Sequence, residues 1–193
     1  LNVKVFTNCK FCLLLLNKKH DYYPNLKNIF IYPHAFKSVQ KEHLGYVETQ
    51  NTVVRSGESW VRGPIVLSWH HALHGGLNHQ DGQNVVLHEF AHQLDQGDGS
   101  SNGTPDLPNA MSYKTWSKVM EKSFVLMTNK IINNEKTILD EYGATSPAEF
   151  FAVLTETFFE KPKQIYTHKP ELYELMKAYY GLDPLQWAGV TRS

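Results

Sequence analysis

The spacing of hydrophobic residues changes along the chain and divides it into a strand-forming part and a helix-forming part. Short apolar segments bounded by turn residues predict strands in the first part; they are residues 28–32, 45–49, 51–55 and 63–69. The last of these begins with Gly63-Pro64, and this favours an edge strand because proline cannot donate a ladder hydrogen bond. Between these strands, residues 56–59 have the composition of a turn.

From residue 83 onward the apolar positions recur at helical spacing. The apolar stripe of the first helix consists of Val86, Phe90 and Leu94. This helix is expected to end at Asp95, before a long loop rich in Gly, Asn, Ser and Pro. Ser146 and Pro147 have the composition of a helix N-terminus. Three later helices are predicted over residues 111–133, 147–160 and 170–180. Because the strands precede the helices, the pattern predicts an α+β fold.

The composition is that of a folded protein without a dominant charge. The 193 residues include 19 Lys+Arg and 19 Asp+Glu, and 41% are hydrophobic. This balance argues against a protein that grips nucleic acid or a membrane through bulk charge. We expect one domain over residues 1–193, truncated at its N-terminus because the chain begins with Leu1 and not with Met. The apolar stretch Cys12–Leu16 is too short to span a bilayer.

Cys9 and Cys12 form a CxxC pair. Such a pair can be a redox site or half of a zinc site, but neither a second pair nor a βαβ pattern accompanies it. We therefore expect two small buried thiols on the face of a helix over residues 1–16. Since the sequence shows no disulfide framework and no export signal, the predicted compartment is the reducing cytoplasm.

The strongest chemical signal is the segment His88-Glu89-Phe90-Ala91-His92. Helical residues four apart lie about 40° apart around the axis, so both imidazoles can bind one ion. Glu89 projects about 100° from His88, where it can hold a water molecule bound to that ion. Zinc lowers the pKa of such a water, and the carboxylate takes its proton as the water attacks a carbonyl group. The alternative is a pair of surface histidines on an ordinary helix.

A catalytic zinc site needs a third protein ligand and an open position. The third histidine of the extended metzincin motif is absent, which leaves carboxylates as candidates. Glu149 is well placed, because the apolar stripe of helix 147–160 would pack it against the motif helix. Asp95 is poorly placed to complete a tetrahedron, and we interpret it as the acceptor for the second N–H of a ligand imidazole. Glu156 shares a face with Glu149 and is a candidate for the same role, or part of a solvated helix face.

A group of histidines precedes the motif, namely His70, His71, His74 and His79. These side chains could form a second metal site, or a flap that places a histidine on the open position of the zinc. The simpler interpretation is a solvated loop between the last strand and the motif helix. Gly75-Gly76 gives this segment a flexibility that suits a lid and a loop equally.

The sequence resembles the Mlc titration factor A family of zinc-dependent peptidases, whose catalytic domain is similar to that of anthrax lethal factor. The resemblance extends from about Cys12 to Trp187. It rests on several ordered blocks, including Ser56-Gly57-Glu58-Ser59-Trp60, the motif with Gln93-Leu94-Asp95, Asp140-Glu141-Tyr142 and Pro147-Ala148-Glu149-Phe150-Phe151. It implies a zincin-like fold, in which a small mixed or antiparallel sheet places an edge strand on the motif helix and further helices follow.

The resemblance also implies residue roles. His88, His92 and Glu149 would bind one catalytic Zn²⁺, and Glu89 would be the general base. Tyr142 would face the metal, where its phenol could donate to the oxyanion; judged without the resemblance, it is an ordinary aromatic residue. The histidine-rich segment departs from the family pattern.

Two functions of different classes follow from this interpretation. The first is a zinc metallopeptidase, aminopeptidase-like on small substrates, in which the strand at Ile65–Trp69 aligns a peptide. The second is a regulatory protein that sequesters a transcriptional repressor of sugar-uptake genes. A metal hydrolase that acts on a non-peptide bond is a third possibility. None of them requires direct contact with nucleic acid or a membrane.

Overall fold

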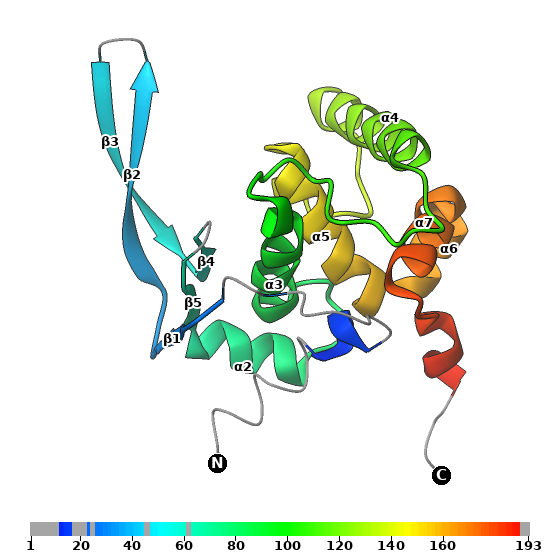
Figure 1. The fold of residues 1–193 in the computed structure, drawn as a ribbon, viewed down its shortest axis with the longest axis horizontal. Coiled ribbons are helices and arrows are strands. Elements are labelled where there is room, and N and C mark those ends of the chain that lie inside the picture. Colours follow the sequence, from blue (N-terminus) through cyan, green and yellow to red (C-terminus); the bar gives the residue numbers. More distant parts are fainter. Residues whose placement is uncertain (1–11, 17–22, 24–25, 45–46, 61–62, 190–193) are drawn as a thin grey trace.

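The computed structural model describes residues 12–16, 23, 26–44, 47–60 and 63–189 (Figure 1). In chain order the elements are η1 (Cys12–Leu15), β1 (Ile29–Tyr32), β2 (Phe36–Leu44), β3 (Val47–Arg55), β4 (Gly57–Ser59), β5 (Ile65–Ser68), α2 (Trp69–Leu77), α3 (Val85–Asp95), η2 (Gln96–Asp98), α4 (Tyr113–Ile132), η3 (Glu141–Ala144), α5 (Pro147–Glu160), α6 (Pro162–His168), α7 (Pro170–Tyr180) and η4 (Pro184–Gly189). This order of strands before helices confirms the α+β prediction. Within the described ranges, no helix has the length and apolar character needed to cross a membrane.

The strands β1, β5 and β4 form a three-stranded mixed sheet. β5 lies in the middle, parallel to β1 and antiparallel to β4. The prediction of an edge strand at 63–69 is therefore wrong. Pro64 lies just before the ladder, which begins at Ile65, so its missing N–H interrupts no pairing. The edge strands of this sheet are β1 and β4, and β4 lies in the segment whose composition suggests only a turn.

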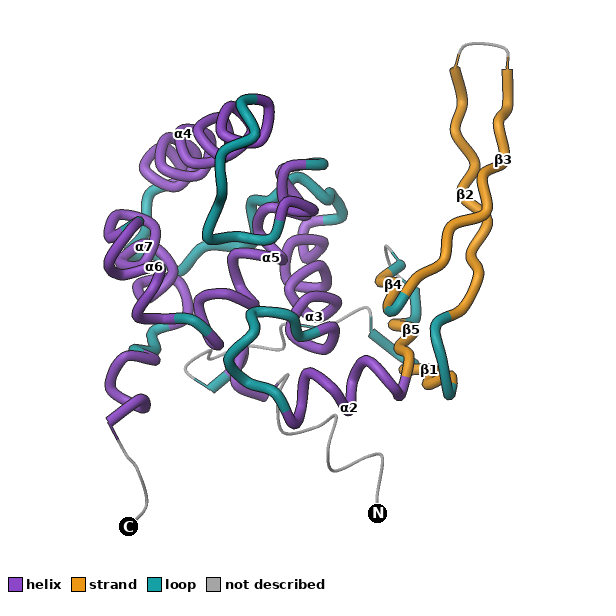
Figure 2. Tube along the Cα trace, turned by 180° about the vertical axis from the view of Figure 1, so that it is seen from behind, coloured by secondary structure: helices purple, strands orange, loops and turns teal. Residues whose placement is uncertain are grey.

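β2 and β3 form a separate antiparallel hairpin that projects away from the helices (Figures 1 and 2). β3 is one continuous strand where the sequence predicts two segments. The sequence does not predict β2, because its apolar residues Phe36, Val39 and Leu44 do not alternate with a period of two. β3 continues through Ser56 into β4, so the hairpin is joined directly to the edge of the mixed sheet.

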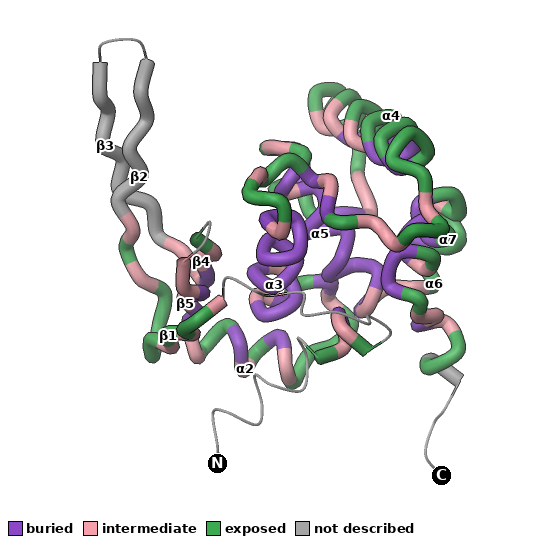
Figure 3. The backbone as a smooth tube through the Cα atoms, in the orientation of Figure 1, coloured by how far each residue is buried: buried purple, intermediate pink, exposed green. Residues whose placement is uncertain are grey.

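The motif helix α3 lies between the mixed sheet and α5 and contacts both (Figure 1). It begins at the N-cap Asn84, whose side-chain oxygen accepts a hydrogen bond of 3.2 Å from the amide of Leu87. Because the helix is covered on both sides, the charged residues Glu89 and Asp95 are buried together with its apolar stripe. Figure 3 shows α3 and α5 as largely buried helices at the centre of the fold. The candidate site is thus held by the most enclosed part of the structure.

The helices predicted from residue 83 onward are confirmed as α3, α4, α5 and α7. Ser146 caps α5 by accepting a hydrogen bond of 3.2 Å from the amide of Glu149. Gly181 ends α7 in the left-handed conformation, with φ 63°. The sequence pattern does not predict α6, which begins at Pro162 directly after α5. Buried residues from η1, the mixed sheet and all six α-helices of the described chain form one hydrophobic cluster.

The histidine-rich segment forms the helix α2, so the loop interpretation is wrong for residues 69–77. Ser68 caps this helix, and the side chains of His70, His71 and His74 are exposed. Gly75 serves close packing, because a Cβ atom there would lie 3.0 Å from the Cα atom of Asn84. The two glycines therefore do not make the segment a flexible loop.

The N-terminal predictions can be compared with the structure only at residues 12–16. A 3₁₀ turn occupies Cys12–Leu15, and Leu14 is buried. The side chain of Cys12 is exposed, so the expected burial of its thiol is wrong. Cys9 and most of the helix expected over residues 1–16 lie outside the described residues.

Candidate metal centre

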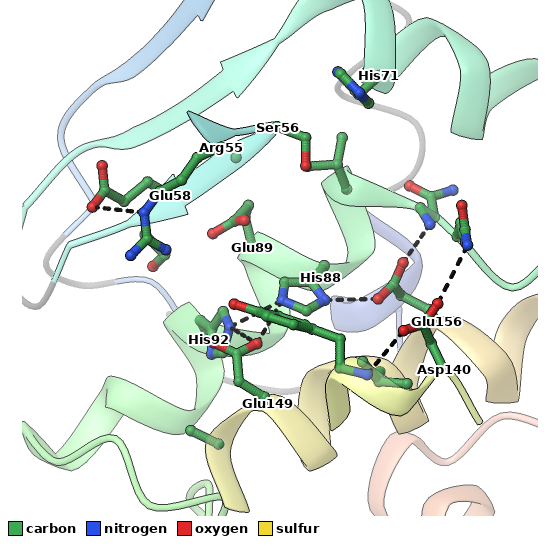
Figure 4. Close-up of a pocket in the computed structure, with 18 of the residues that line it drawn as sticks. Arg55, Ser56, Glu58, His71, His88, Glu89, His92, Asp140, Glu149 and Glu156 are labelled. Carbon is green, nitrogen blue, oxygen red and sulfur yellow. Dashed lines mark hydrogen bonds and ion pairs between the residues drawn. The ribbon is translucent and has the colours of Figure 1, made fainter. Parts of the chain in front are cut away.

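Three side chains that the sequence singles out as ligands converge between α3 and α5 (Figure 4). The Nε2 atom of His88 lies 3.2 Å from Nε2 of His92 and 3.0 Å from Oε2 of Glu149. The distance between His92 Nε2 and Glu149 Oε2 is 3.3 Å. Within the described ranges, no other three His, Cys, Asp or Glu side chains converge closely enough to hold a metal ion.

Local structure explains this convergence. The helical spacing of four residues brings the two imidazole rings together on α3, with ring centroids 4.8 Å apart. Glu149 lies in the first turn of α5, where the Ser146 cap fixes its backbone amide. The packing of α3 against α5 then brings the carboxylate to the rings. The three donors therefore depend on one local spacing and one helix–helix contact.

The separations of the donor atoms fit a tetrahedral metal ion. Two ligand atoms that are each about 2.05 Å from zinc lie about 3.3 Å apart at the tetrahedral angle. The three observed separations are 3.2, 3.0 and 3.3 Å. A set of two imidazole nitrogens and one carboxylate oxygen is also one that zinc accepts at catalytic sites. The residues present therefore fit a divalent metal ion.

Glu156 lies behind His88, as its shared face with Glu149 suggests. Its Oε1 atom is 2.7 Å from Nδ1 of His88, and the side chain is buried. When Nδ1 carries the proton of this hydrogen bond, the lone pair of Nε2 is left free for a metal. Figure 4 shows the Glu156 carboxylate directed at the ring from the side away from Glu89.

The carboxylates around the site favour a positive charge at the position of the donors. Burial alone would lower the pKa of His88, but its hydrogen bonds with Glu149 and Glu156 raise it well above the usual value. Burial alone would raise the pKa of Glu149, but hydrogen bonds from His88 and His92 lower it well below its usual range. A cation bound among the donors would supply the charge that these carboxylates favour.

Glu89 is buried on the neighbouring face of α3, against β4. A Cβ atom on Gly57 would lie only 2.4 Å from Oε1 of Glu89, so the two residues are in close contact. Burial raises the pKa of the Glu89 carboxyl group, and the nearby His88 and His92 oppose this effect in part. The sequence does not indicate that Gly57 is part of the site, because its contact with Glu89 depends on how β4 packs against α3.

Asp95 does not take the role inferred from the sequence. Its Oδ2 atom accepts a hydrogen bond of 2.9 Å from the amide of Gly103 and thereby holds the loop that follows α3. The Nδ1 atom of His92 is buried without a hydrogen-bond partner, as is Oδ1 of Asp95. The interpretation of Asp95 as an acceptor for a ligand imidazole is therefore wrong for this structure.

Tyr142 lies in η3 beside the donors. Its ring centroid is 6.1 Å from that of His88, and the residue is exposed. Asp140 positions this segment by accepting a hydrogen bond of 2.9 Å from the Tyr142 amide. Burial and the neighbouring Glu149 carboxylate raise the pKa of the phenol. The hydroxyl group therefore remains protonated at neutral pH.

The three donors, together with Glu89, Tyr142 and Glu156, line a cavity of about 660 Å³. One wall is formed by β4 together with Arg55, and another by His71 and His74 of α2. The Nδ1 atom of His71 is 2.9 Å from the hydroxyl oxygen of its cap, Ser68. His71 and His74 belong to the cavity wall, and among the described residues none of the α2 histidines joins a group of three metal-binding side chains. The sequence gives no signal for Arg55, which is placed here by the end of β3.

Comparison with known proteins supports the interpretation of the motif. Residues 2–181 match the model of the family described as glucose-regulated metallo-peptidase M90. An uncharacterized protein of Synechocystis sp. is 41% identical over 185 residues, which cover 95% of this chain and 67% of that protein. Mlc titration factor A of Klebsiella pneumoniae is 33% identical over 186 residues, 91% of this chain and 67% of that protein. Mlc titration factor A of Cronobacter sakazakii is 32% identical over 184 residues, which cover 91% of this chain and 66% of that protein.

The chain thus spans about two thirds of the length of these relatives. The family match extends over nearly all of the residues that form the fold and the site. It agrees with the resemblance to Mlc titration factor A that the sequence blocks indicate. The chain therefore belongs to the glucose-regulated metallo-peptidase M90 family.

Proposed function

We propose that this chain is a zinc-dependent peptidase in which His88, His92 and Glu149 bind the ion. The observation that carries the proposal is the convergence of the three donor atoms within 3.3 Å at the wall of a cavity. The family match supports a metallopeptidase. The choice of zinc is supported by the donor set of two imidazoles and one carboxylate.

In this proposal Glu89 is the general base. When bound, zinc would polarise a carbonyl group and lower the pKa of a water molecule. The Glu89 carboxylate takes the proton of the attacking water and passes it to the nitrogen of the leaving amine. The phenol of Tyr142 donates a hydrogen bond to the oxyanion that forms from the scissile carbonyl. Burial of Glu89 keeps its carboxylate close to the reacting atoms and away from bulk water.

The substrate-aligning strand in this proposal is β4. β5 is paired on both sides, whereas β4 is an edge of the mixed sheet, and its residues Gly57–Ser59 line the cavity. An extended peptide could pair with the free side of β4 and so place its scissile bond beside Glu89. This arrangement of an edge strand beside the motif helix supports a zincin-like fold. The common hydrophobic cluster, whose buried members range from Leu14 to Tyr180, supports a single domain.

Removal and return of the metal test this function. We expect purified protein to contain one zinc ion per chain and to hydrolyse small peptides. Chelation should reduce the rate by at least about 10²-fold, and one equivalent of zinc should restore it. Comparison of the hydrolysis rates of peptides with a free N-terminal amine and of the same peptides after N-acetylation tests the aminopeptidase-like preference. Equal activity of the metal-free protein, or unchanged zinc binding after replacement of both His88 and His92 by Ala, would contradict the proposal.

A second candidate function is the binding of a transcriptional repressor in the cytoplasm. It is supported by the relatives at 32–33% identity that are named Mlc titration factor A. Capture of the repressor by the Glu89→Gln variant would show that binding does not depend on turnover. Loss of capture together with loss of turnover would contradict an independent binding role.

Replacement of Gly57 by Ala is expected to lower kcat without removing the metal. The new methyl group would lie 2.4 Å from Oε1 of Glu89 and 2.6 Å from Cγ2 of Val85, so the carboxylate must move. A displacement of about 1 Å at a reacting group can reduce the rate by about 10²-fold. Zinc content should stay at one per chain, because the crowded side chain is not a ligand.

Gly63→Ala is a matched control for this variant. A Cβ atom there would lie 2.7 Å from Cβ of Trp60, and both residues lie between β4 and β5. A similar loss of kcat in both variants would show that the effect of Gly57→Ala comes from the sheet and not from Glu89.

A further inference from the structure

Asn84 connects three helices through a side chain that is fully buried. Its Oδ1 atom accepts from the amide of Leu87 at the start of α3. Its Nδ2 group donates to Oε1 of Glu160 on α5 at 2.7 Å and to the carbonyl oxygen of Gly75 on α2 at 3.0 Å. Both N–H groups of the amide are thereby used, and the orientation of the side chain is fixed.

The backbone of the same residue holds Glu156. The amide N–H of Asn84 donates to Oε2 of Glu156, whose Oε1 atom is 2.7 Å from Nδ1 of His88. Glu156 and Glu160 are one turn apart on α5, and each is only 7% exposed. One buried residue therefore provides a donor to each of two buried carboxylates, and one of these carboxylates contacts a proposed metal ligand.

We propose that Asn84 is a positioning residue for His88. The side-chain amide of Asn84 is held by Glu160, and this contact fixes the position of the Asn84 backbone. The backbone N–H of Asn84 then holds Glu156 in place. Glu156 in turn keeps the proton of His88 on Nδ1 and directs Nε2 toward the other donors. The proposal rests on the proposed function in one respect, namely that His88 is a metal ligand.

A helix cap alone does not explain this arrangement. A cap needs only an acceptor for the amide of Leu87, and Ser or Asp would supply one. Asp would place a third carboxylate beside Glu156 and Glu160, and Ser would leave Glu160 without the amide donor. Asn combines the acceptor that α3 needs with the donors that α2 and α5 need. Gly75 permits this contact, since a Cβ atom there would lie 3.2 Å from Cγ of Asn84.

The test uses Asn84→Ser, which keeps a cap acceptor and removes the amide donor. We expect the Kd for zinc, measured by competition with a chelator, to rise by about 10-fold, as for other residues that orient a metal-bound imidazole. In the zinc-loaded protein, the Nδ1–H proton resonance of His88 should shift and exchange faster with water. Both readouts are independent of peptidase activity.

Thr155→Val is the matched control. Thr155 is a fully buried residue of α5. Its hydroxyl oxygen lies 2.9 Å from the hydroxyl oxygen of Tyr180, and this hydrogen bond includes none of the proposed metal ligands. This variant should lower Tm without changing the Kd for zinc or the His88 resonance. If Thr155→Val weakens zinc binding as much as Asn84→Ser does, general loss of stability explains both and the inference is wrong.

Variants of Glu160 provide a second arm. Glu160→Gln retains an acceptor for the Asn84 amide and should keep zinc affinity within about 3-fold, whereas Glu160→Ala should weaken it as Asn84→Ser does. The double variant of Asn84→Ser and Glu160→Ala should bind zinc no more weakly than either single variant, because both break the same connection. If the losses of zinc affinity in the two single variants add up in the double variant, Asn84 and Glu160 do not act through the same hydrogen bond and the inference is wrong.

The outcomes also separate this inference from the proposed function. If the wild-type protein binds zinc through His88 and Asn84→Ser binds it equally well with an unchanged resonance, only the positioning role is wrong. If the wild-type protein does not bind zinc, or binds it equally well after His88→Ala, the proposed function is wrong and this inference with it.

Discussion

Glu89→Gln is expected to lower kcat by about 10²–10⁴-fold, the usual contribution of a general acid–base group. The glutamine has nearly the same shape but cannot accept the proton of the attacking water. Because Glu89 is not among the three converging donors, zinc content should stay at one per chain. Since the lost interaction is made in the transition state, kcat and kcat/KM should fall by the same factor.

The measurement requires steady-state kinetics on a small peptide, with metal content and Tm determined on the same preparation. Glu89 is 5% exposed, and the substitution removes a buried charge, so Tm should not fall. Full activity of a Glu89→Gln protein that contains one zinc would show that another group accepts the proton. Reduced activity accompanied by loss of zinc would instead place Glu89 among the ligands.

Glu149→Ala is expected to remove zinc binding at micromolar metal concentrations. Loss of a residue that only orients a ligand weakens metal binding by about 10–100-fold, and loss of a ligand should weaken it further. A metal at 1,000 times its Kd stabilises a protein by about 4 kcal/mol. For a protein of this size, that corresponds to a rise of about 8–16 °C in Tm. We expect zinc to produce such a rise in the wild-type protein and none in Glu149→Ala.

Glu171→Ala controls for the loss of a carboxylate in the first turn of a helix. Glu171 occupies that position in α7, as Glu149 does in α5, but it is exposed and pairs with Lys122. Its replacement should leave the zinc-dependent rise in Tm unchanged. If zinc stabilised Glu149→Ala as much as the wild-type protein, the third ligand would have to be another residue.

The part of the site that depends on local spacing could be predicted from the sequence. His88 and His92 are four residues apart on one helix, and helical geometry alone brings their rings together. Glu149 required a further step, because only the packing of two apolar stripes places it beside them. That step could be predicted since both stripes are long and regular, and Ser146 marks the start of the second helix.

The contacts that sequence reasoning assigned incorrectly depend on competition between distant partners. Asp95 lies at helical spacing from His92, but the amide of Gly103 contacts its carboxylate instead. The contacts of Asn84 with Glu156 and Glu160 could not be predicted either, since 72 and 76 residues separate these partners. Periodicity indicates which face of a helix is polar, but not which polar group on another element it meets.

The strand order could not be predicted for a similar reason. The sequence identifies β5 as a strand, but its central place depends on pairing with β1 and with the short β4. Three residues are too few to show a period of two, so β4 looks like a turn. In α2, two glycines lower the helical propensity, and the packing of Gly75 against Asn84 compensates for this.

The position of the donors between α3 and α5 makes a bound metal ion a cross-link within the chain. His92 and Glu149 are 57 residues apart, and the chain between them includes the loop after α3 and the whole of α4. Closing a loop of this length reduces the entropy of the unfolded chain by an amount equivalent to about 4 kcal/mol, by analogy with a disulfide. α4, which carries none of the proposed ligands, lies inside this loop, so a bound ion would stabilise α4 without contacting it.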